Sequence, residues 1–396
     1  MLISIIIPLY NNYKYLPMAL KSVLEQPLDN PDDIEVVIVD DGSTDGSSQL
    51  ADELAETDSR IRVFHQENQW VYAAFNRGVR EAKGEYVYIL NSDDRLEEGS
   101  IPILIQKLQD YNHPDVIWTK VIMCDADLDQ NVISKMCESD AVTVEEYIDS
   151  PSDIHRKWLF LQETNLAQNQ ANLYKRELML HHPFRNDVYA GDIFFNYDIA
   201  KDITSMLIIT ESIYDYFHYN VESKNISMYK YYAYEHEMFS ELLDCGIKLY
   251  QDWNIEEEYY LDFLVLRRLK QLSIETKALT FKSCPMQLHE KLETLFGKYS
   301  DPIIRSLSRK VGREREYESR ILNGANAIIT REKAFNDDDY KFVLTLTKYL
   351  PDHYLDNIDV RNISRDSLDA AIKDVLNPDK IGSVYYSTDW NGEELI

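Results

Sequence analysis

Short apolar runs alternate with helical patterns along the first ~100 residues of the chain. Each apolar run has the length of a strand. Between the runs, apolar residues recur at spacings of three and four, which predicts helices with one buried face. We therefore predict strands at 2–9, 34–41, 61–66 and 85–91, and helix faces marked by Leu16, Leu20, Val23 and Leu24, by Leu50 and Leu54, and by Val71, Phe75, Val79 and Ala82.

This alternation is typical of a parallel α/β sheet with helices on its faces. Each predicted helix leads into a strand, which gives right-handed crossovers and places the loops after the strand ends at one edge of the sheet. In open α/β sheets, ligands bind at that carboxyl edge. The functional residues are therefore expected directly after strands.

The pattern becomes less regular after the fourth strand and changes near residue 225. One more strand is predicted at 115–124, followed by a polar stretch to about residue 165 and a helix and loop segment at 171–187. From about residue 226, apolar residues recur at helical spacing, which predicts helices at 232–250, 257–276, 287–299, 339–350 and 366–376. The predicted fold class is α/β, a mixed sheet flanked by helices at 1–225, with an all-α domain at 226–396.

Composition narrows the class of protein. The chain of 396 residues is longer than one ordinary domain, and it carries 69 acidic and 41 basic residues, for a net charge of -28. Phosphate contacts need a basic surface, so this charge argues against nucleic acid as a partner. The four cysteines are widely spaced, without a metal-finger pattern, and are expected to be reduced thiols.

The N-terminal segment and the basic runs bear on location and partners. The N-terminus lacks the basic region and cleavage site of a signal peptide, and no apolar run approaches the ~20 residues that span a bilayer. We therefore expect a cytoplasmic protein, or one that is peripheral at the inner face of the membrane. Basic runs at 266–272 and 305–315 could contact anionic lipid or a partner, although their acidic neighbours favour a salt-bridged helix face. The apolar faces of the helical domain could also join two copies of the chain.

The first loop excludes two common nucleotide sites, because residues 5–16, "IIIPLYNNYKYL", contain no glycine. A dinucleotide-binding fold needs G-x-G-x-x-G there, and a P-loop needs a Gly-rich turn that ends in Lys and Ser or Thr. The second strand instead ends in Asp40 and Asp41, before a Gly-Ser-Thr turn. These acids either serve the turn and the next helix, or one of them accepts a hydrogen bond from the imide N–H of a base such as uracil.

Two adjacent acids, Asp93 and Asp94, end the fourth strand in "VYILNSDDRLEEGS". One explanation is a loop or helix start, where the helix dipole favours acids. However, adjacent carboxylates repel each other, and no lysine lies near them in the sequence. Mg²⁺ and Mn²⁺ prefer oxygen ligands and are often held by one or two carboxylates together with substrate phosphates. The pair therefore predicts a site for a divalent metal, Mn²⁺ or Mg²⁺, beside a diphosphate.

The order of "IIIPLYNN", "IEVVIVDDGSTDGS" and "ENQWVYAAFNRGVREAKGEYVYILNSDD" resembles the N-terminal half of the family 2 glycosyltransferases, inverting enzymes of the GT-A fold. The resemblance is close over about 100 residues and continues weakly to about residue 228. It implies that Pro8 and Tyr10 wrap the uracil of a UDP-sugar, that Asp40 takes its imide N–H, and that Asp93 coordinates the metal. The positions that match the donor site are Pro8, Leu9, Tyr10, Asp40, Asn68, Asn76, Asn91, Ser92 and Asp93, and those that match the metal site are Asp93 and Asp94.

The resemblance also implies a catalytic base about a hundred residues further on, in an acidic pair at a helix start. The stretch "VYAGDIFFNYDIAKD" matches this pair, with Asp192 as the base and Gly191 in place of a Glu. An ordinary helix N-cap is the alternative for Asp192. In "ESIYDYFHYNVESKNIS", His218 could be a third metal ligand, although a lone histidine in an aromatic strand is more often packed and hydrogen-bonded.

Several positions depart from the family pattern. Asn91 stands where many members have Asp, Phe75 stands where an Arg would lie beside the diphosphate, and Gln69 stands where a Gly is usual. The absence of that Arg makes stabilisation of the diphosphate more dependent on the metal.

These features predict a metal-assisted inverting glycosyltransferase. It would move a hexose or N-acetylhexosamine from a UDP-sugar to a hydroxyl of a glycan acceptor in a capsule, an exopolysaccharide or a surface glycoprotein. Because of the departures at Asn91, Phe75 and Gly191, the main alternative is a non-catalytic glycosyltransferase-like partner subunit of a glycosylation complex. A nucleotidyltransferase is less favoured, since it usually needs a first loop rich in Gly, Arg or Lys.

Overall fold

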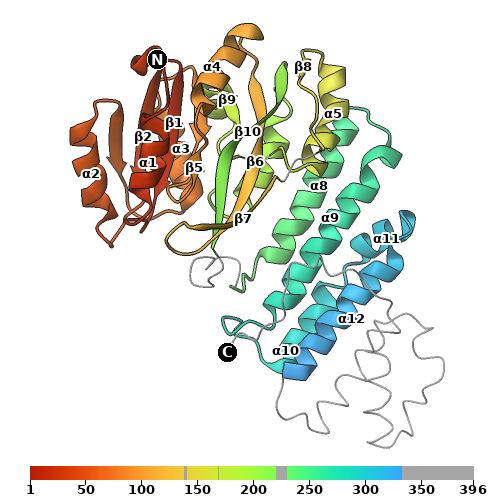
Figure 1. Cartoon of the computed structure of the whole chain (residues 1–396). Helices are drawn as coiled ribbons and strands as arrows, with labels where there is room; N and C mark the ends of the chain where they lie inside the picture. Colours follow the sequence, from red (N-terminus) through yellow and green to blue (C-terminus); the bar gives the residue numbers. More distant parts are fainter. Residues whose placement is uncertain (138–140, 168, 220–229, 332–396) are drawn as a thin grey trace, which may run out of the picture. The chain divides into compact units, whose positions relative to one another are not determined.

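The computed structural model divides the chain into two compact units, which Figure 1 shows in sequence colours. The division after residue 224 lies at the predicted boundary. The first unit also contains residues 248–255, which a single boundary cannot assign to it. The units are Met1–Lys224 with Lys248–Ile255, and Asn225–Ile247 with Glu256–Ile396. The structure describes residues 1–137, 141–167, 169–219 and 230–331.

In the described residues, a ten-stranded mixed sheet forms the centre of the first unit. Its order is β3-β2-β1-β4-β9-β6-β10-β5, with β7 beside β6 and β8 beside β10. The first four strands are parallel, and β9 runs antiparallel to both of its neighbours. The strands are β1 (Ile3–Leu9), β2 (Ile34–Asp40), β3 (Ile61–His65), β4 (Tyr86–Ile89), β5 (Arg95–Leu96), β6 (Val116–Ala126), β7 (Val132–Cys137), β8 (Glu146–Ile148), β9 (Leu173–Lys175) and β10 (Met206–Tyr219).

Helices cover both faces of this sheet, which is why β1 is buried along its whole length and apolar at all positions except Ser4. Ile3, Ile5 and Ile7 point into a core shared with α1 (Leu16–Leu24) and α4 (Ser100–Asp110). On the other face, α3 (Val71–Glu81) packs on β1 and β2. It comes so close that a Cβ at Gly78 would overlap the side chain of Ile6. The remaining helices of this unit are α2 (Ser47–Thr57), α5 (Pro151–Glu163), α6 (Arg176–His181) and α7 (Gly191–Ile199).

The predicted mixed α/β fold is confirmed. The five strands predicted from the sequence are also confirmed, as β1, β2, β3, β4 and β6. The prediction of one polar stretch to about residue 165 is wrong, because β7, β8 and α5 lie there. Strand β7 pairs only with β6 in the described residues, and most of its residues are exposed, so it lacks an apolar pattern. Helix α5 buries Ile154, Trp158 and Leu161 among polar neighbours, which is too few apolar positions to stand out in the sequence.

A continuous row of aromatic rings runs across the face of the sheet opposite the α1 core. Trp118 of β6 packs edge to face on Trp158 and on Tyr174, each at 5.7 Å between ring centroids. Tyr174 contacts Phe195 of α7 at 5.6 Å, and Phe195 stacks on Phe184 at 4.1 Å. The row therefore joins α5, the sheet and α7 into one rigid support.

The second unit is helical in its described residues, as predicted. Its α9 and α12 pack along each other (Figure 1). The predicted helices at 339–350 and 366–376 lie outside the described residues. The observed helices are α8 (Glu235–Asp252), α9 (Glu257–Ala278), α10 (Leu288–Glu293) with a π-helical turn at Thr294–Lys298, α11 (Pro302–Lys310) and α12 (Glu314–Arg331).

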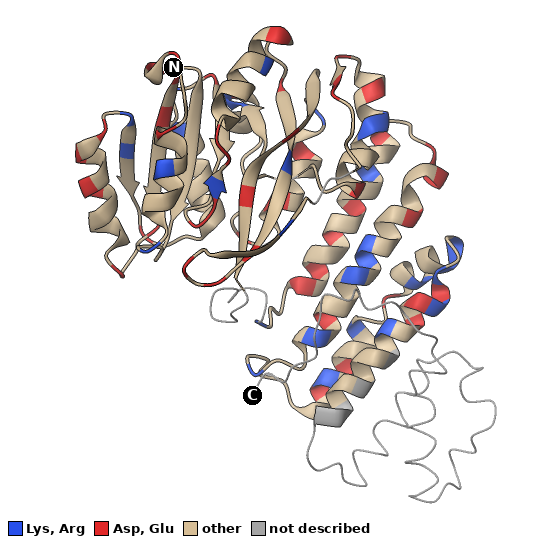
Figure 2. Ribbon diagram, in the orientation of Figure 1, with Lys and Arg blue, Asp and Glu red and all other residues tan. Residues whose placement is uncertain are grey.

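Basic and acidic positions are interspersed along these helices, as Figure 2 shows. Arg313 donates to Asp262 at 2.7 Å, and Arg320 donates to Glu316 at 2.7 Å. In the predicted run at 305–315, Arg309 and Arg313 both have acidic partners, which confirms a salt-bridged helix face there, while membrane contact stays a prediction. The four cysteines form no disulfide with one another. In the described part of the chain, no helix combines the length and apolarity that crossing a bilayer requires.

Candidate active site

The loops after β1, β2 and β4 meet at the carboxyl edge of the parallel strands. Asn12, in the loop after β1, donates from Nδ2 to Oγ of Ser92 at 2.7 Å and from its main-chain N–H to Oγ of Ser47 at 3.0 Å. The N–H of Asp41 donates to the carbonyl of Leu9 at 2.8 Å. The predicted residues that follow different strands therefore share one edge.

Asp40 ends β2 as a buried carboxylate. Its Oδ1 accepts from the N–H of Ser43 at 3.1 Å, and its Oδ2 lies 3.0 Å from Nδ1 of His65. Burial raises the pKa of Asp40, but hydrogen bonds from His65 and Ser43 outweigh burial and hold the pKa below its usual value. Asp40 is therefore ionised near neutral pH, the form that accepts a hydrogen bond from an imide N–H. Its contact with uracil stays a prediction.

Asp41 fixes the loop that leads into α3. Its Oδ1 accepts from Nε2 of Gln66 at 2.8 Å and from the N–H of Gln69 at 2.9 Å. Trp70, which follows Gln69, has a φ of 75° and a ψ of 160°, a backbone conformation that is essentially restricted to glycine. The glycine-like position of this loop is therefore Trp70, and the sequence prediction placed it one residue too early, at Gln69.

The residues at the end of β1 differ in their accessibility. Pro8 and Leu9 are buried, and Leu9 packs in the core of the sheet, so the prediction that the Leu9 side chain contacts a nucleotide is wrong. Tyr10 is 50% exposed, so its ring is accessible to a base. Asn68 is exposed, and its Oδ1 accepts from the N–H of Trp70 at 3.4 Å. The donor-site roles of Pro8, Tyr10 and Asn68 stay predictions.

Asp94 lies inside the protein. Its Oδ2 accepts from the hydroxyl of Tyr214 at 2.6 Å and from Nδ2 of Asn91 at 3.0 Å, and its Oδ1 accepts from the N–H of Phe217 at 2.8 Å. Burial, followed by repulsion from Asp93, raises the pKa of Asp94 to about 8. The prediction that Asp94 binds the metal is wrong, because its carboxyl is buried and both oxygens already accept hydrogen bonds. Asp94 instead anchors the loop that carries Asp93.

Asn91 and Ser92 also hold this loop in shape. The main-chain N–H of Asn91 donates to the hydroxyl oxygen of Tyr214 at 3.2 Å, and its side-chain amide donates to Asp94. Ser92 is buried and accepts from Asn12. These contacts show a role for both residues in shaping the loop, and their contact with the nucleotide sugar stays a prediction.

Asp93 is fixed through its main chain. Its carbonyl accepts from Nε2 of Gln130 at 2.9 Å and from the hydroxyl of Tyr219 at 3.2 Å. Gln130 lies in the turn between β6 and β7, and this turn is held in place where the hydroxyl of Tyr15 donates to the carbonyl of Leu128 at 2.9 Å. Of the two adjacent acids, Asp93 is the one whose side chain is part of the accessible edge.

The metal prediction can be compared with the donor set around Asp93. In the described residues, no group of three or more His, Cys, Asp and Glu side chains could hold a metal ion. Mg²⁺ and Mn²⁺ sites in nucleotide enzymes often use one carboxylate, water and the phosphates of the substrate. A single carboxylate at the nucleotide edge fits that arrangement, so Asp93 remains the predicted metal ligand.

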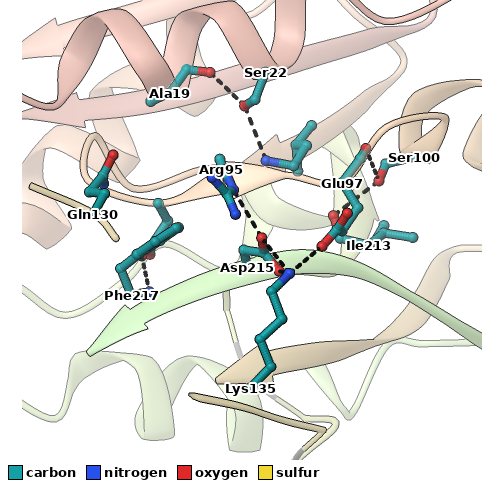
Figure 3. Close-up of polar contacts among 12 residues, drawn as sticks. Ala19, Ser22, Arg95, Glu97, Ser100, Gln130, Lys135, Ile213, Asp215 and Phe217 are labelled. Carbon is teal, nitrogen blue, oxygen red and sulfur yellow. Dashed lines mark hydrogen bonds and ion pairs between the residues drawn. The ribbon is translucent and has the colours of Figure 1, made fainter. Parts of the chain in front are cut away.

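Figure 3 shows the charged residues that brace this loop from β5, β7 and β10. Nε of Arg95 donates to Oδ2 of Asp215 at 2.9 Å, and Nζ of Lys135 lies 3.3 Å from the same carboxylate and 2.9 Å from Glu97. The guanidinium of Arg95 also lies over the ring of Phe217 at 4.8 Å. Asp215 is fully buried, so its two cations offset the cost of burying its charge. The strand that supplies the N–H for the buried Asp94 is thereby held in register.

His218 does not reach the metal-site loop. Its Nδ1 lies 3.1 Å from Oδ1 of Asp125 on β6, and its side chain is exposed. Successive residues of a strand point to opposite faces, and the neighbouring Tyr219 is the residue whose hydroxyl contacts Asp93. His218 is therefore hydrogen-bonded, as the alternative expects, but it is exposed rather than packed, and these contacts give no support to a role as a third metal ligand.

Asp192 lies in the first turn of α7, so the predicted helix start is confirmed. Its Oδ1 accepts from the N–H of Ile193 at 2.9 Å and lies 3.0 Å from the hydroxyl of Tyr72 on α3. A Cβ at Gly191 would overlap the carbonyl oxygen of Arg185 and approach the ring of Tyr72 to 2.8 Å. No side chain fits at this position without movement of its neighbours, which explains the departure from an acidic pair. The role of Asp192 as a base stays a prediction.

Asn76 and Phe75 belong to the support of this corner. Asn76 donates from Nδ2 to the carbonyl of Phe184 at 2.8 Å and accepts from the N–H of the same residue at 2.8 Å. Both ends of its amide thus hold the segment that leads to α7, and the contact of Asn76 with the nucleotide sugar stays a prediction. Phe75 is buried and packs on Phe184 at 5.3 Å, so its ring belongs to the aromatic packing of this corner.

Sequence analysis missed four residues that shape the site. Each of them donates a hydrogen bond from a side-chain hydroxyl or amide. The acceptors are main-chain carbonyl or side-chain carboxyl oxygens of residues that the sequence did predict. Tyr214 and Tyr219 stood in a segment that had been associated with the site, but their position in it gave no hint of their partners. The four residues are Tyr72, Gln130, Tyr214 and Tyr219.

Comparison with known proteins agrees with this geometry. Residues 4–174 match the family model described as Glycosyl transferase family 2. The chain therefore contains a domain of glycosyltransferase family 2. It is 27% identical over 321 residues to EpsH of Bacillus subtilis strain 168, named as a glycosyltransferase, covering 78% of the chain and 86% of EpsH. It is 44% identical over 117 residues to the glycosyltransferase GlyG of Streptococcus pneumoniae serotype 4, covering 29% of the chain and only 38% of GlyG.

Solved structures confirm the GT-A fold class of this glycosyltransferase. S. aureus TarS 1-349 in complex with UDP superimposes with a TM-score of 0.53 at 16% identity, covering 85% of this chain and 94% of TarS 1-349. The same protein in complex with UDP-GlcNAc gives a TM-score of 0.54. At this level of identity, the likeness concerns the fold.

Proposed function

We propose that this glycosyltransferase transfers a hexose or N-acetylhexosamine from a UDP-sugar to a hydroxyl of a glycan acceptor, with inversion and in a single displacement. Asp40 and Tyr10 would bind the uracil, Asp93 would serve the diphosphate through a divalent cation, and Asp192 would act as the base. The acceptor class that we propose is a glycan of a capsule, an exopolysaccharide or a surface glycoprotein.

One observation carries this proposal: Asp192 is tied to the edge that holds Asp40 and Asp93. Asp41 fixes the N–H of Gln69 at 2.9 Å, three residues before Tyr72, whose hydroxyl lies 3.0 Å from Asp192. The start of α7 is therefore fastened to the start of α3, at the carboxyl edge of the parallel strands. A carboxylate at this place has a position expected for a base beside a bound donor.

The chemistry of inversion assigns each residue a task. The oxygen of the acceptor hydroxyl forms a bond to the anomeric carbon on the face opposite UDP, and its proton passes to the carboxylate of Asp192. The bond between the anomeric carbon and the diphosphate oxygen breaks, and its electron pair leaves with UDP. Asp40 holds the base of the nucleotide, so the sugar is oriented before the reaction.

A divalent cation, Mn²⁺ or Mg²⁺, supplies Lewis-acid stabilisation of the leaving diphosphate when it is bound. Asp93 is the side chain of this chain that would hold it. Asp94, Gln130 and Tyr219 act on Asp93 by fixing the loop and its carbonyl, so that its carboxylate is presented in one position. Structures of S. aureus TarS with UDP and with UDP-GlcNAc support the choice of a UDP-sugar as the first donor to test.

Calorimetric titration of UDP tests the nucleotide site. We expect UDP to bind in the presence of Mn²⁺ more tightly than ADP, CDP or GDP, and we expect EDTA to weaken this binding. Asp93→Ala should remove the dependence on metal, and Asp40→Ala should reduce the preference for UDP. Equal affinity for all four nucleotides would contradict the assignment of Asp40. Affinity for UDP that is the same with Mn²⁺ and with EDTA would contradict the assignment of Asp93.

Release of UDP tests the enzyme and its base. The assay uses UDP-glucose, UDP-galactose, UDP-GlcNAc and UDP-GalNAc, with water as the acceptor and then with simple glycosides. Asp192→Asn should bind UDP as the unmodified protein does and lose release of UDP by about 100-fold or more. Unchanged release in Asp192→Asn would contradict the base.

A further inference from the structure

Tyr72 occupies a position on α3 from which its hydroxyl has little room to move. Its side chain is 7% exposed, and its ring stacks on Phe184 at 5.8 Å and packs on Phe75 at 5.9 Å. Phe184 in turn stacks on Phe195 of α7 at 4.1 Å. The ring is therefore held by the same aromatic row that positions α7.

The start of α7 is shaped around this ring. A Cβ at Gly191 would come within 2.8 and 2.9 Å of two carbons of the Tyr72 ring, and it would overlap the carbonyl of Arg185. Atoms at such distances repel each other strongly, so the two helices can approach in this way only with glycine at this position. Gly191 therefore lets the Tyr72 ring lie directly against the turn that carries Asp192.

The Tyr72 hydroxyl has two acceptors within reach. It lies 2.8 Å from the carbonyl oxygen of Tyr189 and 3.0 Å from Oδ1 of Asp192. A hydrogen bond to an ionised acceptor is about twice as strong as one between neutral groups. The hydroxyl hydrogen is therefore directed to Asp192 when that carboxyl is ionised, and to Tyr189 once the carboxyl has taken up a proton.

From this geometry we propose that Tyr72 is a positioning residue for the catalytic base. Its hydroxyl donates to the Asp192 carboxylate, which fixes the orientation of the carboxylate and favours the ionised form that accepts the proton. After proton transfer the Tyr72 hydroxyl donates to the carbonyl oxygen of Tyr189 instead, so it has an acceptor throughout the cycle. This inference rests on the proposed role of Asp192 and adds a residue that acts through it.

Tyr72→Phe tests the role, because it keeps the ring against Gly191 and removes only the hydroxyl. The matched control is Tyr86→Phe: Tyr86 is fully buried on β4, and its hydroxyl donates to the carbonyl of Pro114 at 2.9 Å, without contact to Asp192. Each variant loses one buried hydroxyl that bonds a main-chain carbonyl. A difference between the variants in catalysis therefore reports the bond to Asp192.

The measurements are kcat and KM for UDP release over a range of pH, calorimetric affinity for UDP with Mn²⁺, and thermal stability. We expect kcat of Tyr72→Phe to fall about 10- to 100-fold, with unchanged affinity for UDP. We also expect the low-pH limb of its kcat profile to move to higher pH, because the ionised carboxylate has lost a donor. Tyr86→Phe should keep the kcat and the pH profile of the unmodified protein.

The outcomes separate this inference from the proposed function. No release of UDP by the unmodified protein, or full release in Asp192→Asn, overturns the base and the role of Tyr72 with it. If Asp192→Asn loses release while Tyr72→Phe keeps both kcat and the pH profile, the base stands and the role of Tyr72 is overturned. A fall in kcat with an unmoved pH profile, matched by Tyr86→Phe, assigns Tyr72 a structural role only and also overturns it.

Discussion

Two buried carboxyls, one in each unit of the chain, are held in opposite ways. Glu275 in the helical unit is fully buried between opposite charges and polar partners: its Oε1 lies 2.7 Å from Nη1 of Arg268, and its Oε2 lies 2.9 Å from Nδ1 of His236. Asp94 beside the candidate site instead accepts hydrogen bonds from three neutral donors, on Tyr214, Asn91 and Phe217. The helical unit pairs its buried carboxylate with a cation, whereas burial raises the pKa of Asp94 to about 8, so Asp94 carries little charge near neutral pH.

This difference indicates what each carboxyl is kept for. A paired buried charge mainly concerns the fold, because loss of one partner leaves the other uncompensated. A carboxyl that is buried without a cation is an unfavourable element of the fold, and such elements tend to gather at functional sites. Trp70, in a backbone conformation that is nearly restricted to glycine, is a second unfavourable element at the same edge of the sheet.

The largest expected effect is on the paired charges. Arg268→Ala should lower the free energy of unfolding by roughly 3–5 kcal/mol, because Glu275 would stay buried without its cation. Denaturant unfolding followed by circular dichroism measures this loss. Lys270→Ala, which removes an exposed cation from the same helix, is the control and should change little. The double variant Arg268→Met with Glu275→Leu should recover part of the loss, and a loss in Arg268→Ala no larger than the control would contradict the comparison.

Asp94→Leu should have a smaller effect on stability and a larger effect on binding. It leaves three neutral donors without an acceptor, at roughly 1–3 kcal/mol for each, but it also removes a carboxyl whose own burial is unfavourable, so we expect a smaller net loss in the free energy of unfolding than in Arg268→Ala. Because Asp94 anchors the loop of Asp93, metal-dependent affinity for UDP should fall about tenfold or more in calorimetry. Arg268→Ala, studied where it remains folded, should keep that affinity. If Asp94→Leu binds UDP as tightly as the unmodified protein, the carboxyl does not serve the site.

The sequence predicted what depends on neighbours along the chain. Strands β1, β2 and β4 are buried along their whole length and consist mostly of apolar residues, because both faces of the sheet are covered, and Asp192 lies at a helix start as its local pattern indicated. The sequence did not show the partners of polar side chains when those partners are distant along the chain. Asp94 points inward because Tyr214 lies 120 residues further on, and Asn76 is turned toward Phe184, 108 residues away. No periodicity or spacing contains that information, since it exists only once the sheet has formed.

The second unfavourable element can be removed by one substitution. Trp70→Gly should raise the melting temperature above that of Trp70→Ala, because only glycine adopts φ 75 with ψ 160 without steric strain. The difference should be about 1–2 kcal/mol at the melting temperature, since such residues cost roughly 1–3 kcal/mol and glycine loses about 1 kcal/mol through entropy. Both variants lose the indole, so their comparison isolates the backbone. An equal melting temperature would show that this part of the edge is not strained.

The smallest expected effect concerns Asp40, the acid at the same edge that does have a titratable partner. The hydrogen bond to Asp40 is the largest cause of the raised pKa of His65. Burial raises the pKa of Asp40, but hydrogen bonds, the largest of them from His65, lower it by more. The stability from His65 is therefore complete below its unfolded pKa of about 6.5 and is lost as pH rises through its folded pKa. The part from Asp40 is complete above its unfolded pKa of about 3.9 and is lost as pH falls.

His65→Gln should thus lower the melting temperature most between about pH 4 and 6.5. The corresponding loss in the free energy of unfolding should be less than ~1 kcal/mol, because the His65 side chain is 43% exposed. His113→Gln, which removes a histidine paired with the exposed Glu85, is the control, and an equal pH dependence in the two variants would contradict the coupling of His65 to Asp40.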